Sequence, residues 1–508
     1  MKVSTIVLIG FVLLKFALQY IVISPDYELH RDEYLHLDQA NHLAAGYFSV
    51  PPFTSWIALL IKLLGNTFFW IKFFPALFGA LTLIVVWQIV KELNGQLYAK
   101  SLAAFAIIFS MITRLNILFQ PNSFDVLSWT LVYWCLIRFY KTNNAKQLLW
   151  MAFFFAIGML NKYNLIFLAA GLLPAVLLTN GKNLISNRFT YLALLIILVI
   201  LTPNIIWQYN NHFPVFHHMH ELAATQLVNV KRSDFVIKQF LFFLGSLFII
   251  IAAWIGFLKY PPFKKFRFIF YSYLIILAIY TYFKAKDYYA VGLYPVLIAF
   301  GSVYLEYVLS TARFRKLIRP ILFVIILGLF LPPFYAVFPI LNPEQIKQHS
   351  GRFKKYGVLK WEDGKDHQLP QDFADMLGWK ELAYKVDSIY NSIPKEQNTI
   401  VICENYGEAG AINYYSINKN IHAVSFNADY INWFPLDHEI NNIIAVKEDG
   451  STISDSDKKN FGTIIEVSMI ENKNAREYGT KIILLKDATS SINTFLLNKI
   501  SKYKNENQ

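Results

Sequence analysis

Long apolar runs separated by short polar connections fill the first two thirds of the chain, whereas the last third changes between apolar and polar positions over shorter distances. Each long run comes near the roughly 20 apolar residues that a helix needs to cross a bilayer, so the pattern predicts about eleven spanning helices. They cover residues 3–23, 67–90, 98–118, 123–141, 148–161, 164–179, 189–207, 237–258, 268–283, 287–309 and 319–340. No small-residue cleavage site follows the first run, which indicates an uncleaved helix rather than a signal peptide.

Lysine and arginine are concentrated in every second connection between these runs. Short basic loops stay on the cytoplasmic side of a membrane, so the alternation fixes a predicted orientation. The basic loops contain, among others, Lys91, Lys141, Lys182, Lys264 and Arg315. With the N-terminus inside and an odd number of spans, residues 24–66 and the C-terminal third are predicted to lie outside.

The first outer loop and the C-terminal third have their own elements. Within residues 24–66, the segments 38–46 and 53–64 are predicted to be helices that lie along the membrane surface. Strand-like runs at 399–403, 443–446, 463–467 and 481–485 accompany a helical stretch at 379–393, as in a small α/β domain. The predicted organisation is a polytopic α-helical membrane domain over 1–340, an α/β domain over 341–490 and a polar, fraying tail over 491–508.

Composition narrows the class of protein. Hydrophobic residues make up 55% of the chain and the mean hydropathy is +0.38, more apolar than a soluble protein of this length. The net charge of +13 would suit a nucleic-acid-binding protein, but much of the basic excess lies in the predicted cytoplasmic loops, so that class is excluded. Cys135 and Cys403 fall in different parts of the chain, which predicts no disulfide.

The segment Arg31-Asp32-Glu33 places two adjacent carboxylates just beyond the first predicted span. Charged groups at a membrane surface are costly unless they are paired or functional. A carboxylate in this place can take the proton of an acceptor hydroxyl or amine, which makes Asp32 and Glu33 candidate catalytic residues. The alternative is a solvated loop in which Arg31 pairs with Asp32.

Asn122 and Asp125 open the predicted span 123–141 on the same outer face. One interpretation makes Asn122 a helix cap and leaves Asp125 facing the helix dipole. The other places Asp125 toward a cavity beside Asp32, where it would be a second catalytic acid, with Asn122 as a candidate substrate contact.

Lys162, Lys284 and Lys286 lie on the predicted outer face, against the usual distribution of basic residues. Cations in this place can bind a lipid phosphate. Lys162 can equally extend along an apolar surface toward the interface. Tyr288 and Tyr289 follow directly in the sequence and are further candidate substrate contacts.

His217 and Glu221 are four residues apart and would share one face of a helix in the outer loop 208–236. They are candidate substrate contacts, and a divalent cation is left open, although no cofactor is certain and no familiar metal-ligand spacing occurs. The chain has no Walker loop, no dinucleotide glycine fingerprint and no Gly-x-Ser-x-Gly elbow. An enzyme on an outer face lacks ATP and nucleotide sugars, which favours a lipid-linked sugar donor.

Five segments, in order, carry a family resemblance. They are Arg31-Asp32-Glu33-Tyr34 through Gly46-Tyr47-Phe48-Ser49-Val50-Pro51-Pro52, Leu160-Asn161-Lys162-Tyr163, Pro203-Asn204-Ile205-Ile206-Trp207-Gln208-Tyr209, Asp287-Tyr288-Tyr289 through Tyr294-Pro295, and Asn405-Tyr406-Gly407-Glu408-Ala409-Gly410-Ala411. Together they resemble the family 39 type glycosyltransferases, which include the protein O-mannosyltransferases and the lipid A aminoarabinose transferase.

The resemblance implies the GT-C fold and inverting transfer of sugar from a polyprenyl- or dolichyl-phosphate donor. It implies that Asp32 is the base or the group that orients the acceptor, and that Glu33 supports it. The implied contacts to the donor phosphate are Lys162, Lys284 and Lys286. To these we add Arg31, which directly precedes Asp32, as a further predicted contact.

The sequence departs from the family pattern in two places. Many relatives have Thr-Pro-Asp where this chain has Gln120-Pro121-Asn122, so a second acid is lost there and Asp125, one turn later, is its candidate replacement. Many relatives have Asp-His or Glu-Lys where this chain has Ser49-Val50, so a basic phosphate contact is missing and Lys62 is a candidate substitute.

The prediction is therefore a glycosyltransferase of the bacterial inner membrane that acts on a lipid, glycan or protein acceptor. The alternatives are a polyprenyl-lipid transporter or flippase, and a catalytically silent member that binds the lipid. A polymerase or ligase that moves a whole glycan from a lipid diphosphate is a closer alternative, because the sequence does not separate a monophosphate from a diphosphate donor.

Overall fold

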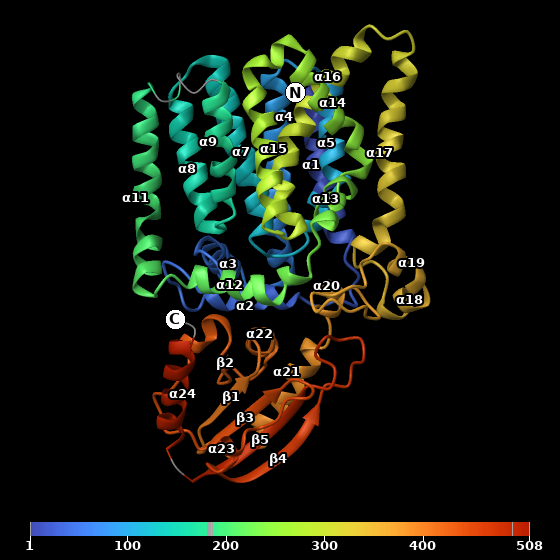
Figure 1. Ribbon diagram of the computed structural model, residues 1–508. Coiled ribbons are helices and arrows are strands. Elements are labelled where there is room, and N and C mark those ends of the chain that lie inside the picture. The colour runs from blue at the N-terminus through green and yellow to red at the C-terminus, as the bar shows by residue number, and fades with distance from the viewer. Residues whose placement is uncertain (1, 180–183, 185, 490, 507–508) are drawn as a thin grey trace.

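The computed structural model describes residues 2–179, 184, 186–489 and 491–506. Lys182 of the predicted basic loops lies outside these ranges. A bundle of long helices forms one end of the molecule and a small domain with a β-sheet forms the other (Figure 1). Short helices lie between the two parts, among them α2 (Arg31–Gln39), α3 (Phe53–Leu63) and α12 (Pro214–Thr225).

The eleven apolar segments predicted as spans are largely helical. The bundle contains α1 (Val3–Ile21), α4 (Phe68–Glu92), α5 (Leu97–Ile108), α6 (Met111–Leu115), α7 (Asn122–Thr142), α8 (Lys146–Asn161), α9 (Leu165–Thr179), α11 (Arg188–Asn210), α13 (Arg232–Leu241), α14 (Leu247–Lys259), α15 (Arg267–Tyr282), α16 (Tyr294–Ser310) and α17 (Arg315–Val337). By length and composition, five described helices can cross a membrane, or up to six if a bent pair counts as one. The predicted number of spans therefore stays a prediction.

Two of the predicted spans are interrupted. The segment 98–118 breaks between α5 and α6, where the Ser110 side chain accepts a hydrogen bond from the Ile112 amide and starts a new helix. The segment 237–258 bends by 63° between α13 and α14. The two breaks meet, because the Met111 amide donates to the Phe242 carbonyl at 3.2 Å. Interrupted helices persist at membrane depth only where such contacts satisfy the freed backbone groups.

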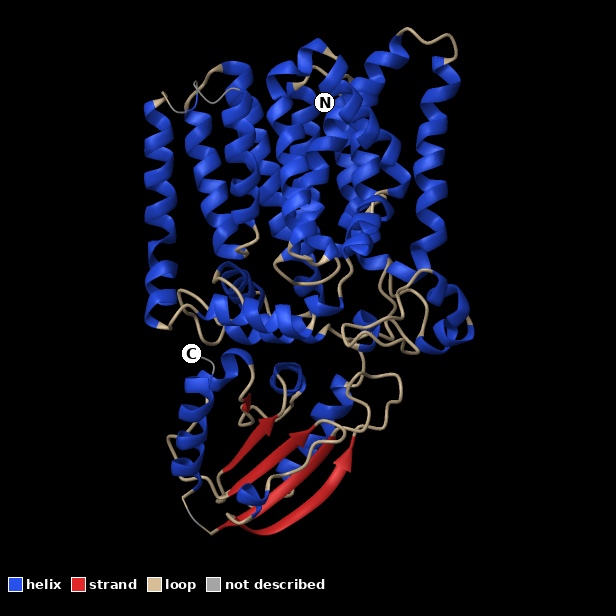
Figure 2. Cartoon of the chain, viewed as in Figure 1, coloured by secondary structure: helices blue, strands red, loops and turns tan. Residues whose placement is uncertain are grey.

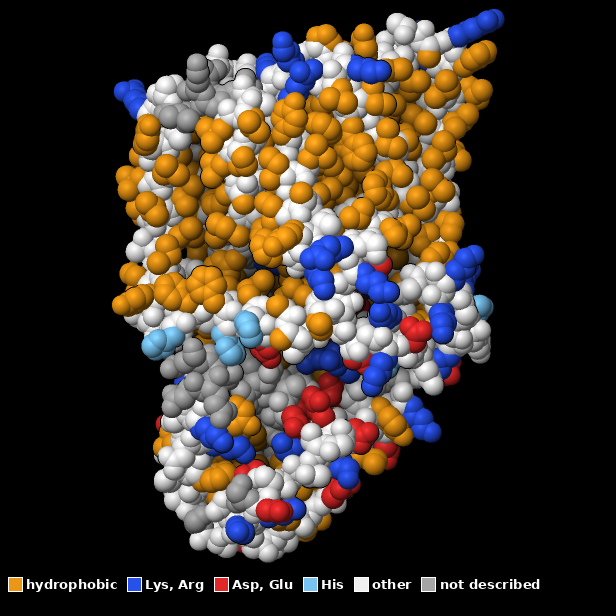
Figure 3. Space-filling model, viewed as in Figure 1, with side chains coloured by type: hydrophobic (Ala, Val, Ile, Leu, Met, Phe, Trp, Pro, Cys, Tyr) orange, Lys and Arg blue, Asp and Glu red, His pale blue; other side chains and the backbone are white. Residues whose placement is uncertain are grey.

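Apolar side chains cover the visible flank of the bundle, while lysine and arginine gather at both of its ends and over the sheet domain (Figure 3). Many large apolar side chains on α1, α11 and α17 are exposed. An exposed apolar surface of this extent matches a lipid environment rather than water. The chain is therefore a membrane protein.

The first outer loop contains α2 and α3, but only α3 lies where a helix was predicted. The predicted helix over 38–46 is wrong, because α2 starts earlier, at Arg31. His30 sets this start: its Nδ1 accepts from the Asp32 amide at 3.2 Å, and Glu33 Oε2 accepts from the His30 amide at 2.8 Å. Such a reciprocal cap fixes the first turn of a helix, and with it the position of Asp32.

The C-terminal domain is built on one five-stranded sheet in the order β2-β1-β3-β5-β4 (Figure 2). Strands β1 and β2, and β1 and β3, are parallel, whereas β3 and β4 each pair with β5 in the antiparallel sense. The strands are β1 (Thr399–Cys403), β2 (Ala423–Ser425), β3 (Asn442–Lys447), β4 (Phe461–Met469) and β5 (Lys481–Ala488). The sequence predicted all of them except the three-residue β2.

Successive strand residues face opposite sides of this sheet. Val401 packs on the side of α21 (Trp379–Asn391) and α22 (Tyr406–Tyr415), whereas Ile400 packs on the side of α24 (Ile492–Glu506). The tail predicted to fray over 491–508 is therefore helical from Ile492 as far as Glu506. The remaining short helices are α18 (Pro343–Gln348), α19 (Ser350–Lys355), α20 (Gln371–Ala374) and α23 (Asp455–Lys458), with 3-10 turns η1 (Leu227–Asn229), η2 (Leu244–Ser246), η3 (Pro261–Phe266), η4 (Asp287–Leu293) and η5 (Ala428–Asn432).

The C-terminal domain docks directly on the first outer loop. Tyr34 of α2 is buried against Trp379 of α21, with ring centroids 5.8 Å apart. Helix α22 comes so close to α2 that a Cβ on Gly410 would lie 2.7 Å from the Tyr34 Cβ atom. The apolar core of the domain therefore continues into α2, the helix that carries Asp32.

Candidate active site

Asp32 lies in the first turn of α2 and faces the C-terminal domain. Its Oδ1 accepts a hydrogen bond from the Tyr406 hydroxyl at 2.6 Å, and its Oδ2 accepts from Gln120 Nε2 at 2.9 Å. The side chain is still 35% exposed, so it remains open to another molecule. Burial alone would raise the pKa of Asp32, but His30, the Tyr406 hydroxyl and Arg31 outweigh burial and lower it to about 2. Asp32 is therefore a reachable carboxylate that is ionised at neutral pH.

Glu33 points the other way and is fully buried. Its two oxygens lie 2.6 Å and 2.7 Å from Lys72 Nζ, and Oε1 also accepts from the Phe119 amide at 2.7 Å. The carboxylate thus links α2, α4 and the segment before α7. Because all of these partners are internal, Glu33 positions Asp32 and does not face a substrate.

A chain of hydrogen bonds leads from Asp32 along the segment that departs from the family pattern. Gln120 donates to Asp32, and its Oε1 accepts from Asn122 Nδ2 at 3.0 Å. Asn122 Oδ1 in turn accepts from Lys162 Nζ at 2.7 Å. The two amides that stand in Gln120-Pro121-Asn122 therefore connect the carboxylate of Asp32 to a cation.

Lys162 sits between α8 and α9 with its ammonium group over two aromatic rings. Nζ lies 5.0 Å from the Tyr288 centroid and 4.4 Å from the Tyr289 centroid, within range for cation–π attraction. Burial lowers the pKa of Lys162 to about 8, although Asp125 opposes that shift. The ammonium group donates one hydrogen bond to Asn122, and its other two N–H groups can donate to an anion.

Lys286 and Lys284 differ in their surroundings. Lys286 Nζ pairs with Glu362 Oε1 at 2.8 Å, and the field of Asp32 is among the attractions that reach it. Burial opposes its charge, but Glu362 outweighs burial and raises the pKa of Lys286. Lys284 adopts a left-handed φ of 53° and forms no ion pair with any described residue.

Asp125 is buried, and each of its carboxylate oxygens accepts a hydrogen bond. Its Oδ1 accepts from Trp129 Nε1 at 3.1 Å and its Oδ2 from Asn164 Nδ2 at 2.8 Å. Among the described residues, it shares no hydrogen-bond partner with Asp32. Asp125 acts electrostatically on Lys162, and its role as a second catalytic acid beside Asp32 stays a prediction.

Of the remaining predicted site residues, Arg31 lies beside Asp32, whereas His217 and Glu221 lie on α12. Arg31 stacks over the Tyr406 ring, with its guanidinium carbon 4.6 Å from the centroid, and so lies next to Asp32. His217 is half-buried and Glu221 is exposed on α12, and neither forms an ion pair with a described residue. Among the described residues, the group with metal-ligand spacing is elsewhere: Glu408, Glu448 and Glu477 in the C-terminal domain.

Sequence reasoning missed Tyr406, Gln120 and Glu362. Tyr406 lies in a segment that carried the family resemblance, and the pattern Asn405-x-x-Glu408 that caps its helix can be read from the sequence. Its contact with Asp32 joins residues far apart in the chain, so local pattern gives no signal for it. Gln120 was seen only as a departure from the family pattern.

The chain is similar to known proteins both in part of its sequence and in its fold. Residues 49–207 match the family model described as dolichyl-phosphate-mannose-protein mannosyltransferase. The fold is similar to the crystal structure of ArnT from Cupriavidus metallidurans bound to undecaprenyl phosphate, with a TM-score of 0.62 and 13% identity over 94% of this chain and 97% of that one. The apo form of the same protein matches with a TM-score of 0.62 and 13% identity, over 95% of this chain and 98% of that one. The chain has the GT-C fold. The fold and the family match confirm the predicted resemblance and the predicted class, a membrane glycosyltransferase.

One further solved structure has a lower similarity to this chain. An oligosaccharyltransferase from Archaeoglobus fulgidus, crystallised with Zn and sulfate, is similar with a TM-score of 0.48 and 13% identity, over 87% of this chain and 68% of that one. None of the curated proteins matches the sequence.

Three of the resemblance segments meet in space. Asn204 Nδ2 donates to the Ala45 carbonyl at 2.8 Å, and Asn204 Oδ1 accepts from the Tyr163 hydroxyl at 2.8 Å. Gln208 Nε2 donates to the same hydroxyl at 2.9 Å. These contacts tie α11 to the first outer loop and to the residue after Lys162, so the segments hold the site together.

Proposed function

We propose that this chain transfers a sugar from a polyprenyl-phosphate donor to a lipid, glycan or protein acceptor, with Asp32 at the reaction centre. Its setting would be the outer face of a bacterial inner membrane, with the C-terminal domain extracytoplasmic. The similar fold of a protein crystallised with undecaprenyl phosphate supports the donor class. The basic connections at the opposite end of the bundle support the orientation.

The observation that carries the proposal is the contrast among three acidic side chains. Glu33 is paired with Lys72, and Asp125 is held by Trp129 and Asn164, whereas Asp32 is partly exposed at the head of a polar chain that ends in Lys162. An exposed carboxylate linked to a cation suits a reaction that joins a nucleophile to a carbon bearing a phosphate leaving group.

In the proposed step, an acceptor hydroxyl or amine forms a bond to the anomeric carbon while the bond from that carbon to the phosphate oxygen breaks. The bonding pair leaves on the polyprenyl phosphate, and the acceptor proton passes to Asp32. A carboxylate with a pKa of about 2 is a weak base, so Asp32 would orient the acceptor first and accept its proton late in the step.

The leaving phosphate needs cations. Within the described part of the chain, Lys162 donates only to Asn122, and the rings of Tyr288 and Tyr289 behind its ammonium group fix its direction. Lys286 would contribute by exchanging Glu362 for the phosphate, and Arg31 lies on the other side of Asp32. Such preplaced charges stabilise a developing anion at little cost in reorganisation.

The test is mass spectrometry of glycolipids and glycoproteins from cells that lack the gene and carry wild type, Asp32→Asn or the exposed control Asp26→Asn. We expect one sugar to be lost in the deletion and in Asp32→Asn, and to be restored by wild type and by Asp26→Asn. Unchanged glycans with accumulated polyprenyl lipid in the deletion would instead indicate a transporter or flippase. Full restoration by Asp32→Asn would indicate that Asp32 is not at the reaction centre.

A further inference from the structure

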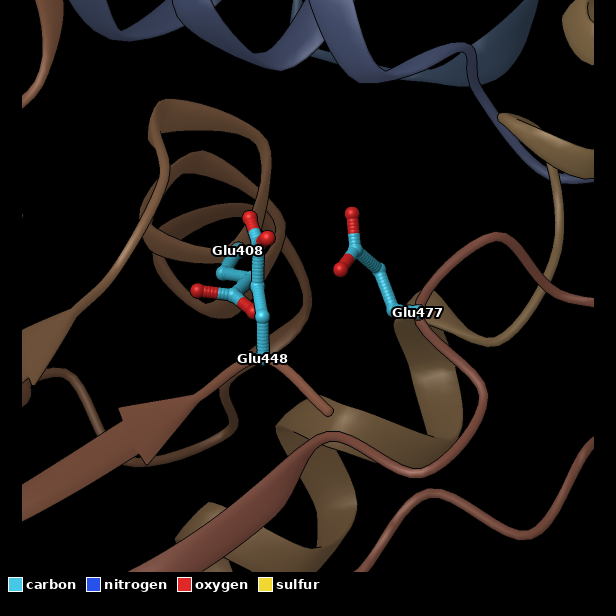
Figure 4. Close-up of side chains that lie close together, drawn as sticks. All are labelled: Glu408, Glu448 and Glu477. Carbon is cyan, nitrogen blue, oxygen red and sulfur yellow. The ribbon is translucent and has the colours of Figure 1, made fainter. Parts of the chain in front are cut away.

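Three carboxylates meet in the C-terminal domain directly behind Tyr406. Glu408 comes from the first turn of α22, Glu448 follows β3, and Glu477 lies in the loop before β5. One oxygen of each lies within 4.8 Å of the others. Figure 4 shows the carboxylates of Glu408 and Glu448 side by side and that of Glu477 turned toward them across a gap.

Two arginines, Arg31 and Arg476, act on Glu477 from a distance, but neither pairs directly with a carboxylate of this cluster. Glu408 is fully buried and Glu477 is 6% exposed, and within the described part of the chain no lysine or arginine forms an ion pair with any of the three. Repulsion between like charges and loss of water both penalise the ionised form. In line with this, burial raises the pKa of Glu477 to about 6 and raises that of Glu408 as well.

Among the described residues, the hydrogen bonds engage only one oxygen of each carboxylate. Glu408 Oε2 accepts from the Glu404 and Asn405 amides, while its Oε1 is buried without any partner. Asn405 Nδ2 donates to Glu448 Oε1 at 2.8 Å and reaches Glu477 Oε1 at 3.4 Å. A buried carboxylate oxygen without a donor is costly, and here the carboxylate that carries it lies in one group with two further carboxylates.

We propose that Glu408, Glu448 and Glu477 bind a calcium ion. Oxygen ligands of this kind suit a hard divalent cation, and calcium accepts an irregular shell completed by water, whereas magnesium demands a near-ideal octahedron. With three protein carboxylates the affinity belongs in the weak class of extracellular modules, with a Kd of about 10⁻⁴ to 10⁻³ M.

The position of the cluster gives the ion a role. Asn405 bonds to all three glutamates and immediately precedes Tyr406, whose hydroxyl donates to Asp32. A cation that fixes the three carboxylates therefore fixes the start of α22 and the placement of Tyr406. Calcium would act as a structural tie between the C-terminal domain and α2, and binding itself does not depend on the proposed transfer reaction.

The test is calorimetric titration of the full-length protein in detergent with CaCl₂ and, separately, MgCl₂, after treatment with a chelator and its removal. We expect one calcium site per chain and weaker binding of magnesium. Glu448→Gln and Glu477→Gln should each weaken calcium binding at least tenfold, while Glu396→Gln, an exposed residue of the same domain, should leave it unchanged.

Glu448→Gln is the main variant, because Glu448 is exposed and lies outside the cap of α22, so its loss leaves folding intact. Calcium binding that is absent in wild type, or unaltered by Glu448→Gln and Glu477→Gln, would overturn the proposal. A second result would also overturn it: a Glu408→Gln protein whose Tm without calcium is higher than that of wild type and does not rise when calcium is added. A proton shared among the carboxylates, and not a bound cation, would then explain why the three acids lie together.

Discussion

The carboxylate of Asp32 is held from two sides by neutral donors that belong to different parts of the molecule. Gln120 comes from the membrane domain and Tyr406 from the C-terminal domain. Both donate to the ionised form, and hydrogen bonds of this kind lower the pKa of a carboxyl group and fix its direction. The reactivity of Asp32 is therefore set by contacts that only the assembled molecule provides.

Tyr406→Phe removes only the hydroxyl that donates to Asp32 and so tests the role of this hydrogen bond. The hydrogen bond to Asp32 is 2.6 Å long, and bonds to charged groups contribute roughly 1.5–3 kcal/mol. We expect turnover to fall by about tenfold or more with little change in Tm, measured by sugar transfer with purified protein. Tyr384→Phe, at a residue that is 73% exposed, is the control. Wild-type turnover in Tyr406→Phe would show that this bond is not used.

The pKa of Lys162 predicts that kcat/KM for the donor declines at alkaline pH. Its ammonium group loses its proton as the pH rises through about 8, so kcat/KM for the donor should fall above that pH by about tenfold per unit. Asp32, with a pKa of about 2, stays ionised down to strongly acidic pH and adds no limb near neutrality.

Lys162→Arg is the matched variant for this profile, because arginine keeps its charge at every pH of the assay. If the ammonium group binds the donor phosphate, the variant should retain measurable activity and lose the alkaline limb. An alkaline limb at the same pH in wild type and Lys162→Arg would assign it to another group.

At the scale of elements, the first turn of α2 is fixed by a buried ion pair. Lys72 of α4 and Glu33 of α2 are both fully buried, and their closest atoms are 2.6 Å apart. Replacing one partner of such a pair leaves a buried charge without a counter-ion and typically costs about 3–5 kcal/mol, whereas replacing both is far milder.

Glu33→Gln should therefore lower the Tm of the purified protein substantially, and Glu33→Gln with Lys72→Met should recover much of it. The comparison is Glu92→Gln, which removes a partly exposed pair with Lys141 and should change Tm little. A Glu33→Gln protein with unchanged Tm and no turnover would mean that Glu33 acts in the chemistry and not in positioning.

At the scale of the whole molecule, the sequence predicted what depends on local pattern. The apolar runs located the helices, and alternation with turn signals located every strand except the short β2. The helix over 38–46 was wrong because a cap by His30 and Glu33 overrode the apolar spacing further along. A histidine cap has no strong sequence signature, since serine, threonine, aspartate and asparagine dominate this position.

The candidate site was less predictable because its contacts join distant segments. The residues that were singled out, Asp32, Asn122, Lys162 and Lys286, do come together around one surface. No local pattern contains the orientation of each side chain. The residues alone therefore left both Asp32 and Glu33 as candidates, and only the family resemblance assigned them different roles. Adjacent helical residues point about 100° apart, so one meets solvent and the other the core.

The orientation of the entire chain across the membrane yields the last prediction. Ile417 is 84% exposed and follows α22 in the C-terminal domain, whereas Phe314 is 63% exposed between α16 and α17. The connection between α16 and α17 lies at the end of the bundle that is remote from the C-terminal domain (Figure 1). The two native cysteines are buried, so a thiol reagent has a low background. Ile417→Cys should react with a membrane-impermeant maleimide in intact spheroplasts, and Phe314→Cys only after permeabilisation. The reverse pattern would put Asp32 on the cytoplasmic face, where nucleotide sugars are available, and would remove the physical reason for a lipid-linked donor.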